Sequence, residues 1–254
     1  MYLVTIGEIF LKGKNRNYFQ RKLVSNIQSA LNVKRNKIKD LRNRIIVFVE
    51  NADNLKYVFG INSYFKVLEC DFNEMNENAL SFIRNQKSFR ISAQRINKNY
   101  KSSKEIEKEV GAFIHDAENI KVDLKNPEIN IRIEIIGNKA YLYTKINEGL
   151  GGLPVGVSGD VFIDVNDEVK SALTAFLMMK RGCRVSLSKD LSLIHKFEHG
   201  LKINIREKNK EDVVVKDYAF ENLKEDNSEN FTLKPLVGYS EDNIKELYNK
   251  IKDL

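Results

Sequence analysis

The stretch NPEINIRIEIIGNKAYLYTKI (126–146) shows most clearly how this 254-residue chain folds. Apolar and polar residues alternate along it in two runs, and Gly137-Asn138 stands between the runs. Such a pattern predicts a β-hairpin, because the alternation buries one face of each strand and the Gly-Asn dipeptide permits a tight turn.

The residues before this hairpin predict the rest of one small α+β domain, which we assign to 73–150. FRISA (89–93) is a further strand, and a short helix is expected over 79–85. Ser102 or Ser103 caps a longer helix. The inner face of that helix carries apolar residues at helical spacing: Ile106, Val110 and Ile114.

Residues 1–72 predict a second domain. Strands are expected at 2–7, 45–49 and 61–70, the last being INSYFKVLEC. An amphipathic helix separates the first two strands, with Asn15 at its N-cap and a short second helix ending at Gly60. The inner face of the long helix is expected to hold Phe19, Leu23, Ile27 and Leu31. This order is typical of a split βαβ, ferredoxin-like sandwich.

Residues 151–254 predict an α/β unit with a mainly parallel sheet, since strands and helices alternate. Strands are expected at 161–165, 183–187, 201–205 and 213–215, with helices ending at Arg181-Gly182 and closing the chain at 240–252. The glycine-rich segment 149–159 (GLGGLPVGVSG) precedes them, as a linker or a functional loop.

Charge is distributed unevenly along the sequence. The net charge is +7, and residues 1–50 alone hold 11 Lys and Arg against 3 Asp and Glu, whereas 151–254 hold 16 against 18. This asymmetry indicates a polyanion partner, with nucleic acid the first candidate. A lysine-rich solvated surface remains an equal alternative, and an anionic membrane surface is a weaker one.

The composition also predicts a location. No apolar run is long enough to span a bilayer, and the first residues lack the pattern of a secretory signal. Cys70 and Cys183 are too isolated to indicate a disulfide framework or a zinc cluster. We therefore expect a cytoplasmic protein with no membrane partner.

Two basic stretches are candidates for phosphate contact. The first is GEIFLKGKNR (7–16), whose basic residues open onto a helix N-terminus. The second is FRISAQRINKNYKSSKEI (89–106), in which Tyr100 could stack on an unpaired base, while Phe89 is expected in the core. A solvated loop is the alternative for the first stretch.

The histidines give little support for a metal site. His195 and His199 are spaced i, i+4 in HKFEH, which resembles half of a zinc pair. The stretch is not HExxH and no third ligand is evident, so we interpret the pair as a coincidence and expect no metal.

The loop VNDEVKS (165–171) stands where an α/β fold would bind a nucleotide. A phosphate-cradling loop needs glycines, so that the backbone can approach the phosphates. This loop has none, and Asp167 and Glu168 would repel a triphosphate. We expect no ATP site of the usual kind.

Several segments, taken in order, resemble the tRNA 4-thiouridine synthases, or tRNA sulfurtransferases. These segments are GEIFLKGKNRNYF (7–19), VFGINSY (58–64), FRISAQR (89–95), VDLKNPEINIRIEI (122–135), GGLPVGVSG (151–159), FLMMKRG (176–182) and LKPLVGYSEDNI (233–244). The resemblance implies an N-terminal ferredoxin-like domain, a THUMP domain that grips the tRNA acceptor end, and a C-terminal ATP-pyrophosphatase (PP-loop) domain.

The C-terminal unit departs from that family. The family's ATP loop is SGGxDS, and alignment on FLMMKRG places Asn166, Asp167, Glu168, Val169, Lys170 and Ser171 over it, with only the serine kept. The unit is roughly half the length expected of the catalytic domain, neither cysteine stands where a sulfur carrier is expected, and there is no rhodanese domain or CxxC. We therefore expect a small, degenerate PP-loop-like domain.

The resemblance and the charge together predict a tRNA-binding protein, a noncatalytic relative or accessory subunit of tRNA thiolation. We expect no catalytic residue and no cofactor. The expected partners are tRNA, a separate tRNA-modifying enzyme and a second copy in a homodimer. The predicted RNA-binding residues are Lys12, Lys14, Asn15, Arg16, Arg95, Lys98, Lys101, Gly151, Gly152, Leu153 and Pro154.

Two alternatives stay open. One is an active ATP-dependent tRNA 4-thiouridine synthase whose ATP site is unconventional or completed by a partner. The other is a protein-interaction module in which the reduced C-terminal domain serves dimerisation.

Overall fold

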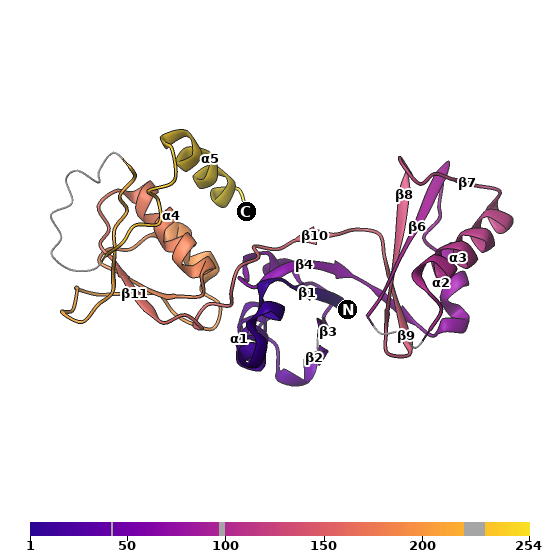
Figure 1. Ribbon diagram of the computed structural model, residues 1–254, viewed down its shortest axis with the longest axis horizontal. Helices are drawn as coiled ribbons and strands as arrows, with labels where there is room; N and C mark the ends of the chain where they lie inside the picture. The colour runs from indigo at the N-terminus through magenta and orange to yellow at the C-terminus, as the bar shows by residue number, and fades with distance from the viewer. Residues whose placement is uncertain (42, 97–99, 221–231) are drawn as a thin grey trace. The chain divides into compact units, whose positions relative to one another are not determined.

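The computed structural model describes residues 1–41, 43–96, 100–220 and 232–254, which form three five-stranded sheets with helices (Figure 1). They group into two compact units. One unit consists of Met1–Leu3 and Phe65–Asn147, and the other joins Val4–Tyr64 to Glu148–Leu254. No helix in the described part of the chain is long and apolar enough to cross a membrane.

The first sheet has the strand order β10-β4-β1-β3-β2. Its strands are β1 (Tyr2–Ile6), β2 (Ile38–Leu41), β3 (Arg44–Val47), β4 (Ile61–Lys66) and β10 (Asn147–Glu148), and its helices are η1 (Glu8–Asn15), α1 (Arg16–Leu31), η2 (Arg35–Lys37) and η3 (Asp53–Tyr57). The order of β1 to β4 is that of a ferredoxin-like sandwich, so that prediction is confirmed.

Helix α1 covers this sheet through Leu23, Val24 and Ile27, which are fully or almost fully buried. Asn15 occupies the N-cap position as predicted, but its side chain makes no capping hydrogen bond. The predicted short second helix is the single 3-10 turn η3.

The second sheet has the order β5-β9-β8-β6-β7. Its strands are β5 (Leu68–Cys70), β6 (Ser88–Arg95), β7 (Lys121–Val122), β8 (Ile129–Ile136) and β9 (Lys139–Tyr143), and its helices are η4 (Phe72–Glu74), α2 (Met75–Leu80) and α3 (Ser103–Glu118). The hairpin prediction is confirmed, since β8 and β9 pair antiparallel around Gly137-Asn138. Ser102 caps α3 by accepting a hydrogen bond from the Glu105 amide.

Two predictions for this region were wrong. The stretch INSYFKVLEC forms two strands, β4 and β5, which belong to different sheets; Val67 between them donates its amide to the Met1 carbonyl instead. The helix expected over 79–85 begins earlier because a capping box of Asp71 and Glu74 starts a turn that runs directly into α2.

The third sheet is entirely parallel, in the order β13-β12-β11-β14-β15. Its strands are β11 (Asp160–Ile163), β12 (Arg184–Leu187), β13 (Asn204–Ile205), β14 (Val214–Val215) and β15 (Thr232–Leu233), and its helices are α4 (Glu168–Lys180), η5 (Ser192–Phe197) and α5 (Glu241–Lys252). The strand order runs outward from β11 in both directions, as in doubly wound α/β sheets. The predicted parallel α/β unit is therefore confirmed.

An aromatic cluster connects the ferredoxin-like domain to the third sheet within their common unit. The ring of Phe59 lies 5.2 Å from that of Phe176 and 5.5 Å from that of Phe197, centroid to centroid. All three side chains are at most 4% exposed. These contacts explain why two segments far apart in sequence form one compact unit.

We predict that Phe59→Ala lowers the free energy of unfolding by about 3–5 kcal/mol, because it leaves a cavity at this junction. Chemical denaturation of the full chain would measure the loss. Phe48→Ala is the matched control, since that ring is 38% exposed. Equal effects of the two substitutions would contradict a packed junction at Phe59.

Candidate nucleic-acid interface and the loop before helix α4

A basic pocket lies at the start of α1. Its volume is about 750 Å³, and it is lined by Gly13, Lys14, Arg16, Asn17, Gln20, Arg21 and Asp40. Gly13 has φ of +51°, which kinks η1 shortly before α1 begins at Arg16. The N-terminal amides of α1 thus lie beside three cationic side chains, an arrangement suited to a phosphate group.

Hydrogen bonds fix the polar groups of the basic pocket. Arg16 donates from Nη2 to Oδ1 of Asn43 over 2.7 Å, and Gln20 donates from Nε2 to the Asp40 carboxylate. Burial raises the pKa of Asp40, while its hydrogen bond to Gln20 and the nearby arginines oppose that rise. Lys14 and Arg21 remain exposed at the rim.

The structure brings three predicted residues, Lys14, Asn15 and Arg16, to the same helix start. Lys12 lies in η1, but its side chain is outside the described part of the structure. Arg21 was missing from the prediction, although the sequence held a signal for it. It follows Asn17 by one helical turn and donates to the Asn17 carbonyl, so it shares the face that begins at the helix start.

The predicted residues of the second sheet make contacts within the protein. Arg95 donates to the Tyr100 carbonyl over 3.1 Å, and Lys101 pairs with Glu109 at 2.5 Å, which raises the pKa of Lys101. The Tyr100 ring stacks on Phe72 with centroids 3.9 Å apart. Tyr100 therefore covers the core on one ring face. Lys98 lies outside the described residues.

The glycine-rich segment 149–159 forms backbone hydrogen bonds with Gly60 and with the residues around the end of α4. Gly151 accepts a hydrogen bond from the Gly60 amide, Leu153 donates to the Lys180 carbonyl, and Gly156 donates to the Gly182 carbonyl. The sequence analysis grouped Gly151, Gly152, Leu153 and Pro154 as RNA contacts. All but Gly151 are buried, and a Cβ at Gly152 would collide with the Lys180 carbonyl oxygen. Their contact with RNA stays a prediction, while the structure gives them a packing role.

The loop before α4 is closed by carboxylates of the chain itself. Asp167 is the N-cap of α4 and accepts a hydrogen bond from the Lys170 amide over 2.8 Å. Asp217 accepts from the Asp167 amide at 3.1 Å and from the Ser171 hydroxyl at 2.7 Å. Ser171 and Asp217 are almost fully buried.

This arrangement fills the position where a helix N-terminus binds an external anion. The amides of Asp167 and Lys170 already donate to carboxylates, and both carboxylates carry the same sign as a phosphate. Two further loop residues have partners in the chain: Lys170 pairs with Glu241 at 2.6 Å, and Asn166 donates to the Asp164 carbonyl. Glu168 is exposed.

Both thiols are buried and neither is activated. Burial raises the pKa of Cys70 to about 11, and burial with the nearby Asp160 charge raises that of Cys183. A sulfur nucleophile needs the opposite shift, because the thiolate is the reactive form.

His195 and His199 have different surroundings: the ring of His199 lies 6.5 Å from that of Tyr57, whereas His195 contacts carboxylates. Nε2 of His195 lies 2.6 Å from Asp190, and its Nδ1 lies 3.1 Å from Glu198. Both ring nitrogens therefore have carboxylate partners. Among the described residues, no three His, Cys, Asp or Glu side chains are grouped as a metal would require.

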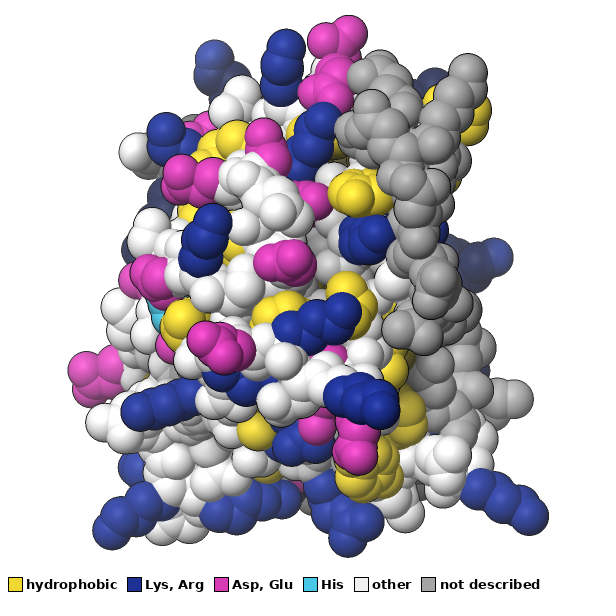
Figure 2. Space-filling view, turned by 90° about the vertical axis from the view of Figure 1, so that its left-hand side faces the viewer, with side chains coloured by type: hydrophobic (Ala, Val, Ile, Leu, Met, Phe, Trp, Pro, Cys, Tyr) yellow, Lys and Arg dark blue, Asp and Glu magenta, His cyan; other side chains and the backbone are white. Residues whose placement is uncertain are grey.

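The C-terminal domain carries charges of both signs on its surface. Figure 2 shows Lys and Arg side chains interspersed with Asp and Glu side chains over the face it presents. Some of them form ion pairs, such as Arg206 with Asp212 at 2.6 Å. By sequence, the excess of positive charge lies in residues 1–50, which belong to the ferredoxin-like domain and contribute the basic pocket.

Two domain families match the chain. Residues 1–64 match the ThiI ferredoxin-like domain, and residues 71–145 match the THUMP domain. The folds of the first and second sheets are thereby assigned, and the third sheet follows them as a parallel α/β domain. The class of protein is a THUMP-domain chain with a ThiI-type N-terminal domain.

Similar proteins agree with this class. A protein of Mycoplasmopsis agalactiae named "Probable tRNA sulfurtransferase" is 40% identical over 195 residues, which are 75% of this chain and 51% of that protein. The crystal structure of PH1313 from Pyrococcus horikoshii is 30% identical, with a TM-score of 0.82 and 98% of both chains covered. A 4-thiouridine synthetase crystallised with RNA and ATP shares the fold, with a TM-score of 0.78 at 22% identity over 98% of this chain and 84% of that one.

The chain belongs to the family of THUMP proteins that includes these tRNA sulfurtransferase relatives. It spans about half the length of the curated relatives that it matches.

We predict that the contribution of His195 to stability depends on pH. Its hydrogen bonds to Asp190 and Glu198 raise its pKa, so the protonated form stabilises the fold. This stabilisation is complete below the pKa of an unfolded histidine, about 6.5, and is lost as pH rises through the folded pKa.

His195→Gln should therefore lower the urea midpoint more at pH 5.5 than at pH 8.5. Asp190→Asn, which removes one partner, should reduce the pH dependence while keeping the imidazole. Equal losses for His195→Gln at both pH values would show that the ion pairs do not stabilise the fold.

Proposed function

We propose that this chain binds tRNA and acts in tRNA modification. The pairing of a ThiI ferredoxin-like domain with a THUMP domain supports this function, as does the name of its relative in Mycoplasmopsis agalactiae. The basic pocket at the start of α1 provides the electrostatic part of the footprint, through Lys14, Arg16 and Arg21. Arg95 and Lys101 are the proposed contacts in the THUMP domain.

We propose further that the chain is a noncatalytic relative or accessory subunit. One observation carries this part: Asp167 and Asp217 occupy the N-terminus of α4, where an ATP-pyrophosphatase loop would hold the nucleotide's phosphates. Displacing Asp217 would leave a buried carboxylate without its two donors, which is costly. The buried, inactivated thiols of Cys70 and Cys183 support the same conclusion.

The second candidate is an active ATP-dependent tRNA sulfurtransferase whose site a partner completes. The 40% identity to a protein of that name favours it. In that case the partner would supply the phosphate-binding groups and the sulfur carrier. ATP binding by this chain with a partner present, but not without one, would distinguish this candidate.

We propose that the chain divides into domains at 1–72, 73–150 and 151–254 and that it is cytoplasmic. We also propose that it acts with a separate tRNA-modifying enzyme and forms a homodimer. The edge strand β13 supports self-association, because Ile205 on it is 47% exposed. An edge strand with an exposed apolar side chain is a common pairing site.

The double substitution Lys14→Glu with Arg16→Glu should weaken tRNA binding by about 10- to 100-fold at moderate salt and reduce the salt slope by about two. The physical reason is the loss of two cations that release counterions from phosphates. Fluorescence anisotropy at two salt concentrations would measure both quantities.

Lys208→Glu with Lys210→Glu is the control for this experiment, with an equal change of charge on exposed residues of the C-terminal domain. The control should bind tRNA within about twofold of the parent, as expected for cations away from the footprint. If both pairs have the same effect, net charge rather than the basic pocket determines affinity.

Calorimetric titration with Mg-ATP should give no binding heat for the unmodified chain, because its own carboxylates fill the helix N-terminus. Asp217→Asn tests whether the Asp217 carboxylate is what prevents Mg-ATP binding, since it removes one negative charge and keeps an acceptor for Ser171. Binding of Mg-ATP by the parent chain would overturn the noncatalytic proposal and leave tRNA binding in place.

A further inference from the structure

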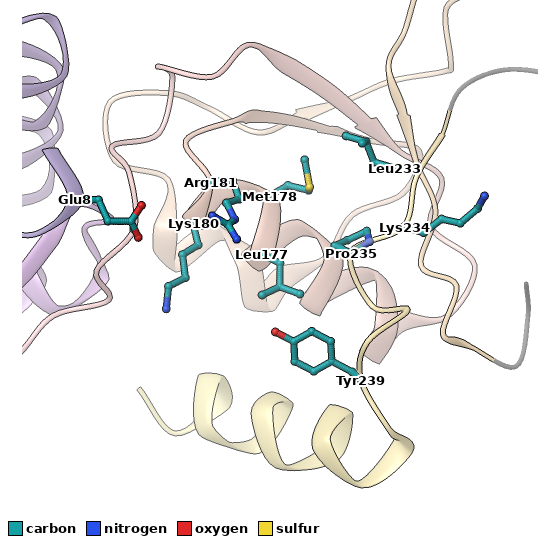
Figure 3. Close-up of a pocket in the computed structure, with 10 residues that line it drawn as sticks. Glu8, Leu177, Met178, Lys180, Arg181, Leu233, Lys234, Pro235 and Tyr239 are labelled. Carbon is teal, nitrogen blue, oxygen red and sulfur yellow. The ribbon is translucent and has the colours of Figure 1, made fainter. Parts of the chain in front are cut away.

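A second pocket lies at the other end of α4. We call it the α4–β15 pocket; its volume is about 600 Å³. Its walls come from the last turn of α4, the segment after β15, the glycine-rich segment and η1 (Figure 3). The lining residues are Glu8, Gly152, Leu177, Met178, Lys180, Arg181, Leu233, Lys234, Pro235 and Tyr239.

This pocket is separate from the closed loop before α4. Asp167 caps the N-terminus of α4, whereas Leu177 is ten residues further along it, about 15 Å at the rise of an α-helix. A ligand here would therefore meet neither Asp167 nor Asp217. The pocket needs an explanation other than the nucleotide site of an ATP-pyrophosphatase.

One wall of the pocket is apolar and contains an aromatic ring. Leu177, Pro235 and Tyr239 are each half-buried, so the protein leaves part of their apolar surface uncovered. Figure 3 shows Leu177 and Tyr239 pointing toward one another across the opening. Aromatic and apolar side chains that border an open pocket suit the flat face of a nucleobase.

Another wall is cationic. Lys180 and Arg181 lie side by side at the end of α4, and Arg181 is exposed (Figure 3). Neither side chain has a hydrogen-bond or ion-pair partner among the described residues. Lys234 also lines the pocket, although Figure 3 shows its side chain extending away. Among the described residues that line the pocket, Glu8 is the one carboxylate, and its oxygens can accept a hydrogen bond from a ribose hydroxyl.

We propose that the α4–β15 pocket binds one unpaired nucleotide of the RNA. The base lies against Leu177, Pro235 and Tyr239, and its phosphate meets Lys180 and Arg181. The volume fits, because small-molecule pockets begin at about 300 Å³. This inference rests on the proposed tRNA binding and adds a contact that reads an unpaired base, whereas the basic pocket contacts only phosphates.

The test compares two RNA probes by fluorescence anisotropy: an unmodified tRNA transcript and a blunt-ended RNA duplex with no unpaired nucleotide. Tyr239→Leu and Arg181→Glu should each weaken binding of the transcript by about tenfold and leave binding of the duplex within about twofold. Lys189→Glu, which reverses an exposed charge elsewhere on the same domain, is the matched control and should change neither.

A second measurement does not depend on variants. A transcript substituted with 5-iodouridine should crosslink under ultraviolet light to the peptide that contains Tyr239, as identified by mass spectrometry. If the parent chain binds the transcript but the variants bind it equally well and no such crosslink forms, the pocket does not hold a nucleotide. If the parent chain binds neither RNA, the proposed function itself fails.

Discussion

The packing of the ferredoxin-like domain against the C-terminal domain depends on a close backbone approach as well as on the aromatic cluster. The segment 149–159 runs between them and donates amides to the carbonyls of Lys180, the last residue of α4, and of Gly182 just beyond the helix. At Gly152, φ is +73° and a Cβ would meet the Lys180 oxygen, so only glycine fits. Asn26 adds a buried hydrogen bond from α1 to the Val155 carbonyl. These hydrogen bonds connect α1, the glycine-rich segment and the end of α4, where the α4–β15 pocket lies.

Local patterns in the sequence were sufficient to predict most elements. The β8–β9 hairpin, helix α3 with its Ser102 cap, and the parallel third sheet each follow from alternation, capping and spacing. Contacts between segments distant in sequence were harder to predict. On α1 the predicted stripe placed Phe19 inside, but Gln20 and Asn26 are the more buried residues, because Asp40 and Val155 provide acceptors that no local pattern records.

In the candidate sites too, features with a local sequence signal could be predicted and contacts between distant segments could not. Lys14 and Arg16 were predictable because they stand at a helix start, but the burial of Leu153 and Pro154 depends on packing. The missing glycines of 165–171 indicated an altered loop, yet Asp217 is 50 residues from Asp167 and carried no signal. At the N-terminus of α4, the loop has no glycine and the backbone amides of Asp167 and Lys170 donate to carboxylates of the chain itself.

The unit that joins Val4–Tyr64 to Glu148–Leu254 has a consequence for synthesis. Phe59 leaves the ribosome 117 residues before Phe176, its partner in the aromatic cluster. At about 5–20 residues per second the delay is about 6–23 s, long compared with the folding of a small domain. The THUMP domain, encoded in between, is complete before that partner exists. During that interval the nascent ferredoxin-like domain must hold Phe59 without the two rings that pack against it in the folded chain.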